Sequence, residues 1–178
     1  DCPALPGKHN HQNAAAAYAA CRAIGVEHGV IMAGLKTFPG LAHRLETVGS
    51  IDGVRFVNDS KATNAQAAEQ ALKAFKNVYW IAGGVPKAEG IEPLAPLFPN
   101  VAKAYLIGAA EDAFATTLKG KVALQKCGTL ENAVAAALRD AKAAGEEDAI
   151  VLLSPACASF DQFRDFEHRG DVFRSIVQ

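Results

Sequence analysis

The chain has 178 residues, half of them hydrophobic, so it can bury one sizeable core but is longer than most single compact domains. Eighteen basic and nineteen acidic side chains leave a net charge of -1. This balance excludes the strongly basic surface that binds nucleic acid or an anionic membrane. We therefore expect one domain with a smaller appendage, and neither nucleic acid nor a membrane as a partner.

The sequence shows no motif for a zinc site, a redox site or a membrane span. Its longest strongly apolar stretch, Ala149 to Leu153, is far shorter than the roughly 20 residues needed to cross a bilayer. The first residues lack an initiator Met and the basic and apolar regions of a signal peptide, so we expect the chain to start inside a longer cytoplasmic protein. The scattered cysteines form no C-x-x-C pair, which favours reduced thiols: Cys2, Cys21, Cys127 and Cys157.

Two helices are expected at the start of the chain. Residues 10–25 are rich in alanine and begin with Asn10, whose side chain can accept hydrogen bonds from the free N–H groups of a first turn. The second helix should run from about 27 to 37 and end before a Pro-Gly pair. Because Pro and Gly break helix and strand alike, residues 38–44 are expected to connect two domains. Residues 1–38 would then be the tail of a preceding domain.

Residues 39–178 alternate between short apolar strands and helical segments. The first two strands, 45–51 and 54–57, flank Asp52-Gly53, a dipeptide that supplies the positive φ angles of a tight hairpin turn. Strands that alternate with helices and are apolar on both faces predict a mostly parallel sheet. The expected fold is α/β: a Rossmann-like sheet with an antiparallel hairpin at its start, preceded by the two helices. We expect further strands at 78–82, 102–107, 121–126 and 148–153, and helices at 64–76, 109–118, 129–144 and 167–177.

The loop of residues 58–64 is the first candidate binding segment, because ligands of open α/β sheets bind at the carboxyl ends of the strands. A helix N-terminus favours anions, and Lys61 and Thr63 would add donors there. The alternative is a capped helix, with Asn64 or Thr63 as its cap and Asp59 solvated.

The second candidate loop follows the expected strand 78–82 and contains Gly83, Gly84 and Lys87. Paired glycines let backbone approach a ligand, and a Lys three residues later can reach a carboxylate or phosphate. The alternative is a plain turn with a surface Lys. The Walker A pattern G-x-x-x-x-G-K-[ST] is absent from the chain.

The third candidate loop, residues 154–163, follows the last apolar strand. Its small residues leave room for a ligand, and Ser159 is a donor close to a new helix start. A catalytic serine or cysteine is the alternative. However, Ser159 lacks the G-x-S-x-G elbow, and no His lies near Cys157 or Ser154 in sequence, although His168 or His43 could approach in space.

Two smaller groups lie outside these loops. Asn10 and Asn13 start the first helix, and Asn amides can recognise the edge of a nucleotide base. Arg44, next to His43, can bind phosphate oxygens bidentately. A helix cap and a surface arginine are the alternatives.

Taken in order, these segments resemble the Mur ligases of peptidoglycan synthesis. The loop D-S-K-A-T-N together with S-P-A-C-A-S resembles the branch of the family that adds D-glutamate. The matching motifs are G-x-H-N-x-x-N (7–13), F-x-G-L-x-H-R-x-E (38–46), N-D-S-K-A-T-N (58–64), G-G-x-x-K (83–87) and L-S-P-A-C-A-S-F-D-Q-F-x-x-F-E-x-R-G (153–170).

The resemblance implies a monomeric, cytoplasmic, ATP-dependent ligase that joins D-glutamate to UDP-N-acetylmuramoyl-L-alanine through an acyl phosphate. It implies a central ATPase domain that ends near residue 38 and an amino-acid-binding domain over 39–178. ATP and Mg²⁺ would be needed, but the P-loop, a modified lysine and the magnesium ligands would lie upstream, so this chain alone should be inactive. No metal ligand is expected in the chain itself.

The resemblance also implies roles for individual residues. Arg44 and Lys61 would stabilise charge that develops during the reaction. D-glutamate has two carboxylates, which two separate groups of donors would bind. The implied contacts are Asn13 with adenine, Asp59 with ribose, Arg44 with phosphates, Thr63 and Lys87 with one carboxylate, and Ser159, Phe160 and Phe166 with the other.

Two other classes of protein remain open. The absence of a P-loop is compatible with a stand-alone Rossmann-like module that binds a nucleotide or an acidic amino acid without turnover. A hydrolase built on Ser159 or Cys157 is the third interpretation.

Overall fold

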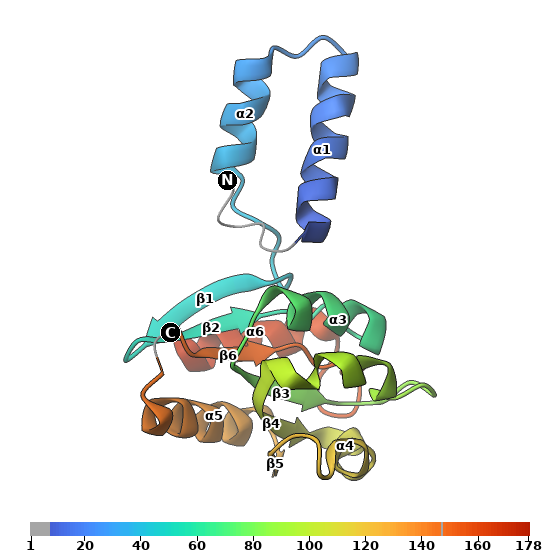
Figure 1. The fold of residues 1–178 in the computed structure, drawn as a ribbon, viewed down its shortest axis with the longest axis vertical. Helices are drawn as coiled ribbons and strands as arrows, with labels where there is room; N and C mark the ends of the chain where they lie inside the picture. Colours follow the sequence, from blue (N-terminus) through green and yellow to red (C-terminus); the bar gives the residue numbers. More distant parts are fainter. Residues whose placement is uncertain (1–7, 147) are drawn as a thin grey trace.

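A computed structural model describes residues 8–146 and 148–178 (Figure 1). Helices α1 (Lys8–Ala23) and α2 (His28–Thr37) form a hairpin that stands apart from an α/β body (Figure 1). The prediction that Asn10 caps the first helix is wrong, because α1 already begins at Lys8; Asn10 Oδ1 instead accepts from Asn13 Nδ2 at 3.4 Å. Within the described ranges, no helix is long and apolar enough to cross a membrane.

The body contains a six-stranded sheet with the order β1-β2-β6-β3-β4-β5. Strand β1 pairs antiparallel with β2, and the other pairs are parallel, which confirms the predicted sheet. Asp52 and Gly53 have φ angles of 52° and 85° and connect the paired residues Ile51 and Val54, so the predicted hairpin turn is also confirmed. The strands are β1 (Glu46–Ile51), β2 (Val54–Asn58), β3 (Val78–Gly83), β4 (Val101–Ile107), β5 (Leu124–Gly128) and β6 (Ile150–Leu153).

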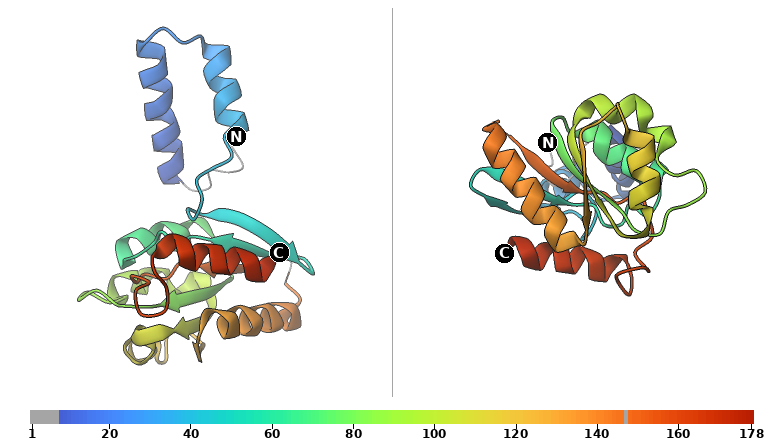
Figure 2. Two further views of the ribbon diagram at one scale, coloured as in Figure 1. Left: turned by 180° about the vertical axis from the view of Figure 1, so that it is seen from behind. Right: turned by 90° about the horizontal axis from the view of Figure 1, so that it is seen from below.

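Helices cover both faces of the sheet (Figure 2). A hydrophobic core lies on each face of the sheet. Strand β3 contributes to both, with Trp80 in the first core and Ile81 in the second, because successive side chains of a strand point to opposite faces. The first face carries α3 (Ala65–Ala74), the 3-10 helix η1 (Glu92–Asn100) and α4 (Glu111–Leu118), and the second carries α5 (Leu130–Ala144) and α6 (Phe166–Val177).

Besides shifts of one or two residues at the ends of elements, strand β5 and helix η1 differ from the sequence prediction. Strand β5 begins at Leu124 rather than 121, because residues 119–122 turn back on the end of α4, where Leu118 O accepts from the N–H groups of Lys121 and Val122. Helix η1 was not predicted. In the sequence alone, several prolines within a few residues suggest an irregular loop. Here they recur at every third position, which matches the three-residue turn of a 3-10 helix: Pro93, Pro96 and Pro99.

The sheet has a topological switch point between β2 and β6. Strand β2 leads into α3 on the first face, whereas its neighbour β6 leads towards α6 on the second face. Where the connections after two neighbouring strands cross to opposite faces of a sheet, a crevice forms at the carboxyl ends of those strands. The loops of residues 58–64 and 154–163 therefore both begin at the edge where ligands bind in such sheets.

Candidate functional site

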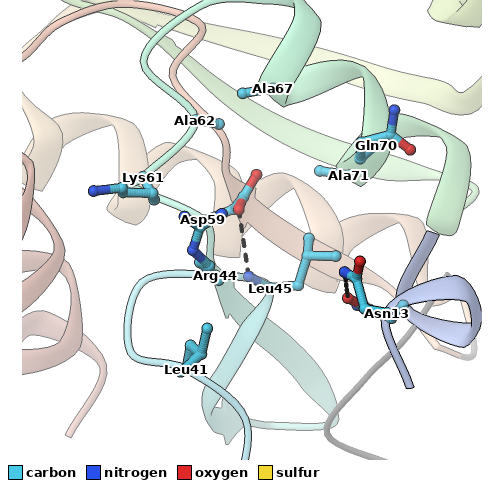
Figure 3. A pocket seen from close by; sticks show the side chains of 11 residues that line it. Asn13, Leu41, Arg44, Leu45, Asp59, Lys61, Ala62, Ala67, Gln70 and Ala71 are labelled. Atoms are coloured by element: carbon cyan, nitrogen blue, oxygen red, sulfur yellow. Dashed lines mark hydrogen bonds between the residues drawn. The ribbon is translucent and has the colours of Figure 1, made fainter. Parts of the chain in front are cut away.

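A cavity of about 310 Å³ opens at this edge (Figure 3). Helix α1, the connecting segment, the loop after β2 and helix α3 contribute to its wall. The cavity brings together Asn13, Arg44 and Asp59, which are predicted to bind the nucleotide. It also contains Lys61, which is predicted to stabilise developing charge, although the four residues come from separate parts of the chain. The lining residues are Asn10, Asn13, Leu41, Arg44, Leu45, Asp59, Lys61, Ala62, Ala67, Gln70 and Ala71.

Asp59 is a buried carboxyl group in the wall of the cavity, with only 7 % of its surface exposed. Ser154 Oγ donates a hydrogen bond to it at 2.8 Å, and the Leu45 N–H donates at 3.4 Å. Burial raises the pKa of Asp59 to about 7, despite the opposing effects of these two donors and of the Arg44 charge. The interpretation of Asp59 as a solvated residue is therefore wrong. Asn64 caps α3, as its side chain accepts from the Ala67 N–H at 2.8 Å.

The raised pKa predicts that Asp59 makes the protein less stable as pH rises. Between about pH 4 and pH 7 the unfolded chain has lost the Asp59 proton while the folded chain still binds it, so the free energy of unfolding falls with pH in that window. Asp59→Asn should remove a fall of about 3 kcal/mol between pH 5 and pH 8, measured by urea unfolding at these two pH values. An unchanged difference between the two pH values would contradict this assignment.

Lys61 and Phe166 lie in direct contact at the junction between the loop after β2 and helix α6. The Lys61 Nζ is 3.8 Å from the centre of the Phe166 ring, and the His43 ring lies 6.1 Å from that ring at an angle of 82°. A residue expected to serve phosphate chemistry and one expected to serve the amino acid thus meet at one point. Phe166 is the first residue of α6, whose cap Asp165 accepts from the His168 N–H at 2.7 Å.

The loops after β3 and β6 lie side by side. Val85 and Ala158 exchange two backbone hydrogen bonds of 2.8 and 3.0 Å, so Lys87 and Ser159 belong to neighbouring loops. Lys87 is exposed, Ser159 is buried, and Phe160 has 73 % of its surface exposed. Residues expected to bind the amino acid do not line the cavity of Figure 3: Thr63, Lys87, Ser159, Phe160 and Phe166.

The last residue of β3, Gly83, and the next residue, Gly84, pack closely against neighbouring backbone. A Cβ atom on Gly83 would lie 1.9 Å from Ile107 O, and one on Gly84 would lie 2.3 Å from Ala158 O. Their φ angles are +135° and +123°, which side chains disfavour. Close packing against neighbouring backbone therefore accounts for a glycine at both positions, and the approach of a ligand to this backbone stays a prediction.

Gly83→Ala should destabilise the protein by about 4 kcal/mol or more, because the added methyl group meets the backbone of β4. Gly53→Ala is the matched control, as its φ is +85° but a Cβ there meets nothing within 4 Å. The control should cost only about 1–2 kcal/mol of backbone strain. Chemical unfolding of both variants measures the difference, and equal losses would show that close packing at Gly83 is unimportant.

The structure argues against nucleophilic catalysis by the third loop. Cys157 has no exposed surface, and burial raises the pKa of its thiol to about 12, so the reactive thiolate is not available near neutral pH. Ser154 donates its hydroxyl to the Asp59 carboxyl rather than to a histidine.

The sequence places Arg169 within the motif of residues 153–170 without indicating a role for it. The structure buries it completely at the switch point, where it donates to Ser60 and to the backbone of Cys157. A signal was present: Arg169, Phe173 and Val177 recur at four-residue spacing and so share the buried face of a helix. Ser154 was likewise treated only as a possible nucleophile.

The described residues contain no group of three or more His, Cys, Asp or Glu side chains that could hold a metal ion. The donor set of the cavity suits an organic ligand with polar groups instead, since amide, guanidinium and carboxyl groups converge there.

The fold and the cavity together define the class of protein. It is a Rossmann-like α/β domain with a polar ligand site at the carboxyl edge of its sheet, extended by a helical hairpin. A family model described as "Mur ligase, glutamate ligase domain" matches residues 43–157. The chain belongs to the Mur ligase family.

Curated relatives match over nearly the whole chain. The UDP-N-acetylmuramoylalanine–D-glutamate ligase of Caulobacter sp. (strain K31) is 64% identical over 97% of this chain and 37% of its own length. The ligase of the same name from Phenylobacterium zucineum is 61% identical over 98% of this chain and 37% of its own length. The chain thus spans a little over a third of the relatives that it matches.

Solved structures show a similar fold. The UDP-N-acetylmuramate-alanine ligase of Thermotoga maritima has a TM-score of 0.67 at 14% identity, covering 96% of this chain and 38% of that one. The bifunctional folylpolyglutamate synthase/dihydrofolate synthase of Yersinia pestis has a TM-score of 0.57 at 20% identity, covering 85% of this chain and 34% of that one. At these identities the comparison concerns the fold alone.

Proposed function

We propose that this chain is the carboxy-terminal part of an ATP-dependent, cytoplasmic ligase that adds D-glutamate to UDP-N-acetylmuramoyl-L-alanine in peptidoglycan synthesis. The observation that carries the proposal is the 64% identity, over 97% of the chain, to a relative named for this reaction. The candidate site supports it, because cationic and hydroxyl side chains gather on three loops at one edge of the sheet.

Residues 1–38 are proposed to be the tail of the preceding ATP-binding domain, and 39–178 the amino-acid-binding domain. Support comes from the helical hairpin, which exposes large apolar side chains to solvent: Ile24 is 81% exposed and Val30 is 64% exposed. In α2 the buried residue is Ile31. Such helices are stabilised by packing against a further part of a protein.

The cavity is proposed to hold one side of the nucleotide. Asn13 offers an amide to the adenine edge, Arg44 offers a planar guanidinium to the phosphates, and Asp59 offers a carboxyl to a ribose hydroxyl. Lys61 would add positive charge at the far side of the same cavity. Mg²⁺ and the phosphate loop are expected to be held mainly by the preceding domain, so this chain alone should not turn over ATP.

The loops beyond the cavity are proposed to hold D-glutamate. Thr63 and Lys87 would bind one carboxylate, and Ser159, beside Phe160 and Phe166, the other. Two carboxylates at opposite ends of the substrate require two separated sets of donors, and the three loops start from three neighbouring strands.

The chemistry explains why both ligands must meet. A carboxylate does not condense with an amine in water, so ATP first transfers its terminal phosphoryl group to the muramoyl-alanine carboxylate and leaves as ADP. The D-glutamate amine then attacks the acyl carbon, phosphate leaves, and the amine loses a proton. Arg44 and Lys61 would stabilise the negative charge that develops on phosphate and on the tetrahedral carbon.

The test is ADP formation by the full-length protein that carries this chain. ADP release should require both UDP-N-acetylmuramoyl-L-alanine and D-glutamate, and L-glutamate should not replace the D-isomer. Residues 1–178 alone should release no ADP under the same conditions. Binding of nucleotide without any substrate-dependent turnover by the full-length protein would favour the binding module instead.

A further inference from the structure

Arg169 is the second largest of the fully buried side chains, with no exposed surface. Its Nε donates to Ser60 Oγ at 2.9 Å. Its Nη2 donates to Ser60 O at 2.9 Å and to Cys157 O at 3.1 Å. One guanidinium group on α6 thus holds the backbone of two loops that follow different strands.

The burial of this charge is costly. No carboxylate in the described ranges forms an ion pair with Arg169, and its Nη1 is buried without a hydrogen-bond partner. Burial lowers the pKa of the guanidinium to about 10, although the Asp161 charge opposes this. An apolar residue of similar volume would often be at least as stabilising at such a position. Stability alone is therefore a poor reason for an arginine here.

The two loops that Arg169 joins carry different ligand groups. Ser60 lies between Asp59 and Lys61, which line the nucleotide cavity, and Cys157 lies two residues before Ser159. Ser60 Oγ, which accepts from Arg169, also donates to Phe166 O at 2.8 Å.

The guanidinium also lies beside the loop after β3. A Cβ on Gly84 would lie 3.3 Å from Arg169 Nη1, so the group occupies the point where the loops after β2, β3 and β6 converge.

We propose that Arg169 is a positioning residue that holds the loop of Asp59 and Lys61 in register with the loop of Ser159, so that the donors for the nucleotide and for D-glutamate are correctly placed only while both loops are in place. The inference rests on the proposed function, since it uses the assignment of Asp59 and Lys61 to the nucleotide side and of Ser159 to D-glutamate. Because catalytic geometry is sensitive to shifts of about 1 Å, loss of the guanidinium should affect both ligands together.

The experiment uses the full-length protein with Arg169→Met, Arg169→Lys and a control, Phe173→Leu. Phe173 is buried on the same helix and its ring lies 6.2 Å from that of Phe56 in β2, so its truncation weakens the packing of α6 on the sheet without removing a hydrogen bond to Ser60 or Cys157. Arg169→Met should raise the KM values for ATP and D-glutamate together, each about tenfold or more. Arg169→Lys should restore part of the loss because an ammonium group can still donate to both carbonyls. Phe173→Leu should lower the unfolding midpoint while both KM values stay within twofold.

Hydrogen exchange supplies a readout that does not depend on turnover. Arg169→Met should speed exchange in residues 59–63 and 157–160, and Phe173→Leu should not. An inactive parent protein would defeat the proposed function while leaving this measurement valid. An active parent in which Arg169→Met changes one KM alone, or changes both no more than Phe173→Leu does, would overturn the inference. If Arg169→Met does not fold, Arg169→Lys becomes the test. The inference is then overturned if this variant changes neither of the two KM values nor the rate of hydrogen exchange in the two loops.

Discussion

Arg44→Ala in the full-length protein is expected to lower kcat by about 100- to 1000-fold while the KM for D-glutamate changes by no more than a few fold. Arg44 lines the cavity and lies close enough to Asp59 for their charges to interact, so its guanidinium is at the nucleotide side of the site. A cation there would act on charge that develops in the transition state, and its loss should therefore appear mainly in kcat.

Steady-state kinetics with ATP and D-glutamate varied separately would test this expectation. Arg139→Ala is a suitable control, because Arg139 is a largely exposed arginine on α5, on the other face of the sheet from α3. Arg44→Lys should recover only part of the rate, since an ammonium group cannot bind phosphate oxygens as a planar fork. An Arg44→Ala variant with a normal kcat and a raised D-glutamate KM would place Arg44 with the amino acid instead.

Lys87→Ala is expected to raise the KM for D-glutamate and to lower kcat/KM by about ten- to hundredfold, with little change in the KM for ATP. A hydrogen bond to a charged group contributes roughly 1.5–3 kcal/mol, which sets this range. Lys87 is exposed on a loop that two backbone hydrogen bonds hold against Ala158, so its ammonium group is free to reach a small ligand from a fixed backbone. Ser159→Ala should act in the same direction.

The same kinetics with Lys119→Ala provides the control, because Lys119 is an exposed residue at the end of α4. Two outcomes would be incompatible with this assignment. Equal effects of Lys87→Ala and Arg44→Ala on both ligands would mean that these two residues do not serve separate ligands. Complete loss of turnover in Ser159→Ala would indicate a nucleophile rather than a hydrogen-bond donor.

Local chemistry predicted the elements well where its signal acts over a few residues. Asp52-Gly53 supports positive φ angles whatever surrounds it, and Asn64 caps the first turn of α3 with its own side chain. The 3-10 helix η1 was not predicted, because several prolines in a short segment usually indicate an irregular loop. Only the three-residue spacing of the prolines distinguishes a 3-10 helix from such a loop. The start of β5 depended on the turn after α4, which apolar periodicity does not describe.

By itself, the sequence determined the kinds of element, their order and the family resemblance, because periodicity, turn residues and motifs are local properties of the chain. The tertiary structure alone decided that β6 lies between β2 and β3. This strand order brings Ser154 to Asp59 across 95 residues and Arg169 to Ser60 across 109. The raised pKa of Asp59 and the burial of the Arg169 guanidinium result from these tertiary contacts. Desolvation depends on all the residues that exclude water from a group, and most of them are distant in the chain.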